Sequence, residues 1–82
     1  MQLLSKPAMT FRTVVWHGIE FQIPSDHVAI AADKNGWVYS FPDRPSLTVF
    51  KECWMGQAGC WDLCQVDLEG MPWQDTLAEY PL

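Results

Sequence analysis

The chain has 82 residues, a formal net charge of −5 and a 49% share of hydrophobic residues. This length allows a single hydrophobic core, and the apolar content predicts a folded chain rather than a disordered one. No apolar run approaches the roughly 18 residues of a membrane span, and the start lacks the features of a secretory signal. We therefore expect a cytoplasmic protein that makes no membrane contact.

The three cysteines are Cys53, Cys60 and Cys64. An odd number is a poor basis for a disulfide framework, which agrees with the reducing cytoplasm. The C-x-x-C spacing of structural zinc sites is absent, so we expect no metal and no cofactor. A site completed by Cys53 and a histidine is left open. A small core without crosslinks also leaves a homodimer open as a source of stability.

The charges divide unevenly along the chain. Residues 1–51 carry five Lys or Arg and four Asp or Glu, a net +1, whereas residues 52–82 carry six Asp or Glu and no Lys or Arg, a net −6. A negative surface repels phosphate backbones, so we expect no direct binding of nucleic acid. Such a surface suits a basic patch on another protein, although it can also serve only for solubility.

The first ten residues predict an N-terminal arm, and residues 11–82 predict one β-rich domain. Residues 11–16 are rich in β-branched and aromatic side chains, and residues 19–23 alternate between apolar and polar. The intervening His17-Gly18 predicts the turn of a β-hairpin.

A second hairpin is predicted by the small-residue strand 27–32, the turn Asp33-Lys-Asn-Gly36 and the strand 37–41. The alternative for residues 27–32 is a single helical turn capped by Ser25 or Asp26. Asn-Gly readily adopts the positive φ angles of hairpin turns. The strand 37–41 places three aromatic residues on one face.

The later elements are less regular. Residues 47–50 and 52–55 predict two extended segments, with one strand broken at Lys51 as an option, and residues 60–66 predict a last long strand whose Cys60, Asp62 and Cys64 share a face. Residues 73–80 fit either a helical turn begun by Pro72 or a short edge strand. The predicted fold is mainly β: five to six short antiparallel strands in a meander or half-open barrel, with a short C-terminal helical turn as an option.

No local signature of an enzyme surrounds His17, His27 or the cysteines, and the glycines lie scattered, with no phosphate-binding loop. The five tryptophans are the strongest functional signal, because Trp is enriched at the centres of protein–protein interfaces. Trp54 and Trp61 flank the Gly56–Gly59 turn, and we predict them to be the most exposed pair. The predicted partner-binding residues are Trp54, Trp61, Asp62, Asp67 and Glu69.

Two segments carry a resemblance. Residues 28–41 (VAIAADKNGWVYSF) and residues 71–77 (MPWQDTL) resemble a hairpin and a closing motif of small proteins encoded by bacteriophages and prophages. In size, charge and lack of motifs the chain is also similar to anti-CRISPR proteins. The resemblance implies a binding protein that modulates a host defence or nucleic-acid-handling protein in the bacterial cytoplasm. The alternative is a homo-oligomeric structural or accessory phage module.

Overall fold

Residues 10–48 and 50–82 are described by a computed structural model in which strands predominate. The strands are β1 (Phe11–Trp16), β2 (Ile19–Pro24), β3 (Ala29–Ala32), β4 (Trp37–Phe41), β5 (Ser46–Thr48), β6 (Cys53–Met55), β7 (Trp61–Gln65) and β8 (Ala78–Glu79), with the 3₁₀ turn η1 (Trp73–Asp75) before β8. The mainly-β prediction is confirmed. The strands are more numerous than the five to six predicted, and the expected arm lies outside the described residues except for Thr10.

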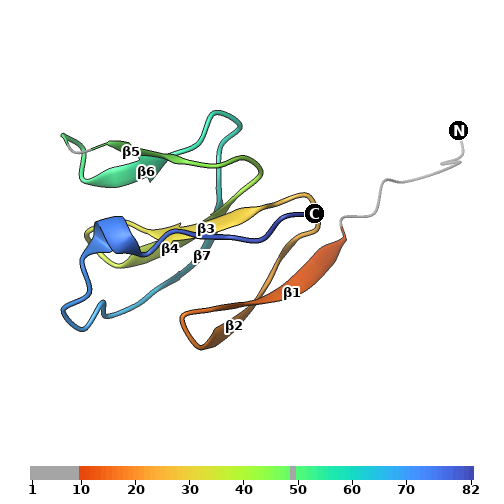
Figure 1. Ribbon diagram of the computed structural model, residues 1–82, viewed down its shortest axis with the longest axis horizontal. Helices are drawn as coiled ribbons and strands as arrows, with labels where there is room; N and C mark the ends of the chain where they lie inside the picture. The colour runs from red at the N-terminus through yellow and green to blue at the C-terminus, as the bar shows by residue number, and fades with distance from the viewer. Residues whose placement is uncertain (1–9, 49) are drawn as a thin grey trace, which may run out of the picture.

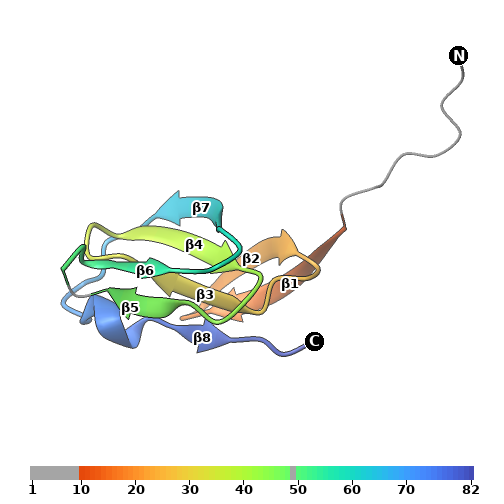
Figure 2. The ribbon, with the colours of Figure 1, turned by 90° about the horizontal axis from the view of Figure 1, so that it is seen from above.

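The strands form three antiparallel sheets that stack as layers (Figure 1). The central sheet has the order β7-β4-β3-β8, the β1–β2 hairpin lies on one side of it, and the β5–β6 hairpin lies on the other. Figure 2 shows the same stack from above. No closed barrel forms among the described strands, because each hairpin packs a face onto the central sheet.

Strand β3 of the central sheet is buried on both faces. All four residues of β3 are fully buried, and the two neighbours Ile30 and Ala31 point to opposite layers. Ile30 packs with the β1–β2 layer, whereas Ala31 packs with Phe41 and Trp54 on the β5–β6 side. A run of small apolar residues is therefore what a strand covered on both faces requires.

Both predicted hairpin turns are confirmed. In the first, His17 and Gly18 have φ angles of 46° and 80°, and β1 pairs with β2 in continuous register. In the second, Asn35 Oδ1 accepts a hydrogen bond of 3.1 Å from the Trp37 amide, and Gly36 has φ 86°. Positive φ at His17, Gly18 and Gly36 matches the right-handed twist of the flanking strands.

The extended segments predicted over residues 47–55 are present in part as β5 and β6, but the option of a single strand broken at Lys51 is wrong. The chain reverses there, and β5 pairs with β6 so that Leu47 lies opposite Trp54. Glu52 has φ 54° in this reversal, although it is not glycine. Its carbonyl accepts a hydrogen bond of 3.3 Å from the Lys34 amide, and its carboxylate lies 3.1 Å from Lys34 Nζ. These contacts with the neighbouring turn stabilise a conformation that the local sequence does not signal.

The predicted face of Cys60, Asp62 and Cys64 is also wrong. The register between β4 and β7 shifts at a bulge, so that Val38 lies opposite Cys64 whereas its neighbour Tyr39 lies opposite Asp62. Residues opposite each other in antiparallel strands share a face, and a bulge inserts one extra residue. Asp62 and Cys64 therefore lie on opposite faces of the sheet.

The C-terminal segment contains both of the elements that its sequence allowed, η1 followed by β8. Thr76 between them is fully buried. Its hydroxyl accepts a hydrogen bond of 2.9 Å from the Ala32 amide and donates one of 2.7 Å to the Trp73 carbonyl, while its own carbonyl accepts from Trp16 Nε1 at 2.8 Å. The closing motif thus links the central sheet to the β1–β2 layer.

The three-residue turn η1 is the longest helical segment among the described residues. No helix in this part of the chain is long and apolar enough to cross a membrane.

Candidate functional site

The acidic C-terminal part presents most of its carboxylates to solvent. Asp62 lies on β7, Asp67 and Glu69 lie on the loop after it, and Asp75 lies in η1; all four are exposed. Within residues 10–48 and 50–82 none of these four forms an ion pair. The two other C-terminal acids do, Glu52 with Lys34 and Glu79 with Arg44, each at 3.1 Å. The uncompensated negative charge therefore lies on β7, the loop that follows it, and η1.

Trp61 is the exposed tryptophan of this region. It is 41% exposed, lies opposite Ser40 at the start of β7, and packs edge-on against Phe11 of β1 with ring centroids 6.0 Å apart. Phe11 is itself 45% exposed. The two rings form an aromatic pair, accessible to solvent, at the junction of the central sheet and the β1–β2 layer.

Trp54 is less exposed than predicted, so the prediction that Trp54 and Trp61 form the most exposed pair of tryptophans is wrong for Trp54. The side chain is half-buried, and its indole Nε1 donates to the Ala32 carbonyl at 3.0 Å. Its ring packs edge-on against Trp73 at 6.2 Å, on the opposite side of the central sheet from Trp61. Trp54 therefore belongs to the packing between the β5–β6 layer and the central sheet.

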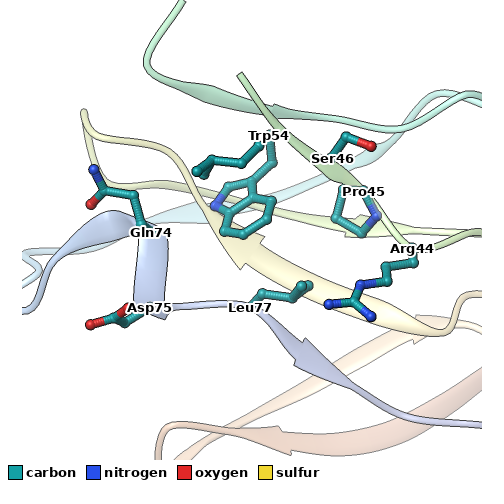
Figure 3. A pocket seen from close by; sticks show the side chains of 8 residues that line it. Arg44, Pro45, Ser46, Trp54, Gln74, Asp75 and Leu77 are labelled. Atoms are coloured by element: carbon teal, nitrogen blue, oxygen red, sulfur yellow. The ribbon is translucent and has the colours of Figure 1, made fainter. Parts of the chain in front are cut away.

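A shallow hollow of about 530 Å³ lies over Trp54 (Figure 3). Gln74 and Asp75 lie on one side of the indole, and Arg44 and Pro45 lie on the other. The Arg44 guanidinium pairs with Glu79 outside the lining, whereas Asp75 in the lining has no ion-pair partner among the described residues.

A second hollow, of about 250 Å³, separates the turn of the β1–β2 hairpin from the loop after β7. Its apolar wall consists of Trp16, Ile19, Val66, Leu68 and Met71, and its polar groups come from His17, Asp67, Glu69 and Thr76. Two of the predicted binding residues, Asp67 and Glu69, are therefore brought together here. The length of β7 (Trp61–Gln65), about 13 Å at a strand rise of about 3.3 Å per residue, lies between them and Trp61.

The loop that carries the two acids is held by hydrogen bonds within the loop and to the turn between β3 and β4. Asp67 Oδ1 accepts a hydrogen bond of 2.9 Å from the Glu69 amide. Glu69 and Gly70 follow with φ angles of 51° and 84°, and the amide of Val66 donates to the Gly36 carbonyl at 2.8 Å. The two carboxylates therefore project from an ordered turn.

Negative charge also affects the neighbouring titratable groups. Burial raises the pKa of Tyr39, and Asp33 and Asp62 add to the increase. Burial, followed by the charge of Asp62, raises the pKa of the Cys60 thiol, and burial raises that of Cys64. Both sulfurs are thus further from the thiolate form that attacks electrophiles or binds metals.

One hydrogen-bonded pair has the composition of a catalytic dyad. His27 Nδ1 lies 2.7 Å from Ser40 Oγ, and burial lowers the pKa of His27 although Asp26 opposes the change. Ser40 is fully buried in the central sheet, so a substrate cannot reach its hydroxyl oxygen. The pair joins β4 to the segment before β3 and is structural.

No group of three His, Cys, Asp or Glu residues is placed to hold a metal ion within the described ranges. Trp37 is one exposed aromatic residue that the sequence did not single out, at 39% exposure on β4 opposite Gln65. The sequence feature that pointed to the exposure of Trp37 was its position directly after the turn of the second hairpin.

Comparison with protein-family models, with curated proteins and with solved structures gave no significant match to the chain in any of the three searches.

Proposed function

We propose that this protein is a small binding module that modulates a host protein by direct contact, through the negative surface of β7 and the loop that follows it. In this proposal the protein comes from a bacteriophage or prophage and acts in the bacterial cytoplasm. The partner is a defence or nucleic-acid-handling protein with a basic surface, and the module itself performs no catalysis.

The observation that carries the proposal is the set of exposed carboxylates on β7 and the following loop that have no ion-pair partners in the described ranges: Asp62, Asp67 and Glu69. Uncompensated charge of one sign raises the association rate with a partner of the opposite sign and disfavours other partners. Trp61 adds apolar area beside Asp62, and exposed Trp is typical of residues that dominate binding energy. Trp54, by contrast, is assigned to packing.

The proposal is tested by affinity capture of the tagged protein from a bacterial lysate, with the bound proteins identified by mass spectrometry. We expect one dominant protein with a basic surface, which moderate salt releases because screening weakens exposed charge pairs. Recovery of the bait alone, at low as well as moderate salt, would contradict the proposal.

A homo-oligomeric accessory module is the second candidate, and the exposed Phe11–Trp61 pair favours it, because two accessible rings at a sheet edge could pack against a second copy. Light scattering combined with tryptophan fluorescence separates the two candidates. A stable oligomer that dissociates in Trp61→Ala would support the second candidate, and a monomer at micromolar concentration would support the first.

A further inference from the structure

The hollow between the β1–β2 turn and the loop after β7 combines an apolar wall with a negative rim. Ile19 and Met71 are 42% and 40% exposed, so their side chains border the opening, whereas Trp16 is nearly buried and closes the inner wall. The volume of about 250 Å³ suits one long side chain rather than a peptide segment or a large ligand.

The charged groups of this hollow are of one sign. Asp67 and Glu69 line it, and among the described residues no Lys or Arg does so. The one other titratable group in the lining, His17, lies with its Nε2 3.2 Å from the Thr76 carbonyl oxygen. Lys34 borders an adjoining hollow that also includes the two acids, but its Nζ lies 3.1 Å from Glu52 Oε2 and so has a carboxylate of its own. The carboxylates of Asp67 and Glu69 thus remain available to a cation from outside.

We infer that this hollow is an anchor site for one cationic side chain, Lys or Arg, of the partner; the inference rests on the proposed function. The aliphatic stem packs along Ile19, Leu68 and Met71, and the charged head binds the carboxylates of Asp67 and Glu69. Long basic side chains bury their methylene groups against apolar surfaces while the head keeps polar contacts. Hydrogen bonds between such a head and carboxylates are among the stronger ones in proteins.

The geometry favours this occupant over an apolar or an anionic one. An apolar side chain would desolvate two carboxylates without compensation, which costs free energy. An anion would meet like charge at the rim. The hollow over Trp54 lacks this selectivity, because its lining carries charges of both signs, Arg44 and Asp75.

The test uses three capped tripeptides, Gly-Arg-Gly, Gly-Lys-Gly and the neutral isostere Gly-citrulline-Gly, titrated into the ¹⁵N-labelled full-length protein. We expect saturable shifts of the amide signals of Leu68 and Glu69 and of the Trp16 indole N–H signal with a cationic peptide, and no saturation with citrulline. A stronger response to the arginine peptide than to the lysine peptide would assign the head group to a guanidinium, and the reverse order would assign an ammonium.

The variant Asp67→Asn/Glu69→Gln should weaken cationic binding at least about tenfold, as expected for charge-assisted hydrogen bonds. Asp26→Asn removes one exposed charge from the turn between β2 and β3, outside the hollow, and serves as the matched control, with binding nearly unchanged. Because the Asp67 carboxylate also accepts from the Glu69 amide, Glu69→Gln alone is the second variant, which leaves that turn intact.

Equal shifts with citrulline, no saturation with either cation, or equal weakening by Asp26→Asn would overturn the anchor site. The peptides report on the hollow without any partner. If they fail while affinity capture still recovers a basic protein, the anchor site is refuted and the proposed function stands. If they bind while capture recovers the bait alone, the proposed function is refuted and the hollow remains a cation site.

Discussion

Thr76→Val should destabilise the fold by more than an ordinary surface substitution. The side chain is fully buried, and valine has nearly its shape but no hydroxyl. The Ala32 amide then loses the acceptor that Thr76 Oγ1 provides at 2.9 Å. The Trp73 carbonyl retains donors, the Thr76 amide at 3.3 Å and Trp54 Nε1 at 3.4 Å. The main loss is therefore one buried N–H without a partner.

Leaving a buried donor unsatisfied costs about 1–3 kcal/mol, out of a total stability of about 5–15 kcal/mol for a typical domain. In a chain of this size each kcal/mol lowers Tm by about 4–8 °C, so we expect a fall of at least about 4 °C. Urea unfolding followed by tryptophan fluorescence measures the free energy, and hydrogen exchange of the Ala32 amide reports the lost bond directly.

Thr76→Ser is the control, since it keeps the hydroxyl and removes one methyl group, at a cost of about 0.8 kcal/mol for the lost burial. Protection of the Ala32 amide should persist in Thr76→Ser and fall in Thr76→Val. If Thr76→Val has wild-type stability and leaves this amide protected, the assignment of Thr76 as the link between the closing motif and β3 is refuted.

Three further predictions concern the turns, the buried histidine and the tryptophans. Gly36→Ala should destabilise severely, because the added Cβ would lie 2.1 Å from the Val66 carbonyl oxygen at a φ of 86°, and urea unfolding measures the loss. The folded-state pKa of His27 is lowered, so the unfolded state binds more protons and stability should fall as pH drops below about 6.5; unfolding free energies between pH 5 and 8 test this. Trp54→Ala should cost about 3 kcal/mol, and Trp61→Ala clearly less, in parallel thermal melts, because Trp54 is half-buried with an indole hydrogen bond to the Ala32 carbonyl whereas Trp61 is 41% exposed.

Matched variants keep these predictions specific. Gly18→Ala combines a similar φ of 80° with open space around the added Cβ, so it isolates the backbone penalty of about 1–2 kcal/mol. Equal losses in the two glycine variants would show that the approach of Val66 is unimportant. A pH dependence that persists in His27→Gln would assign it to another group. Equal losses for the two tryptophans would contradict their different burial.

The two glycine-containing hairpins were predictable because their turn residues carry a local conformational signal. The β5–β6 reversal was not, because Glu52 adopts positive φ through contacts with Lys34, a residue distant in the sequence. The bulge in β7 likewise depends on pairing with β4. It explains why the alternation over residues 60–66 is poor.

Some properties of the predicted binding residues could be predicted from the sequence, and others depend on the tertiary fold. The charge and solvent exposure of Asp62, Asp67 and Glu69 follow from the sequence, because residues 52–82 contain no Lys or Arg to pair with these carboxylates and unpaired carboxylates are more stable in water. The position of Trp54 did not follow, because its indole finds an acceptor on β3, which only the tertiary fold brings near. That Asp67 and Glu69 share a hollow with the β1–β2 turn is also a tertiary property.

The most direct test of the central claim is parallel capture from one bacterial lysate with two folded baits, the wild-type protein and the variant Asp62→Asn/Asp67→Asn/Glu69→Gln/Asp75→Asn. Circular dichroism and Tm confirm beforehand that both baits are folded. If the negative surface is the interface, the wild-type bait recovers a dominant basic protein that salt releases, and the neutralised bait recovers little of it. Equal recovery by both baits, or no specific protein with the wild-type bait, would contradict the claim.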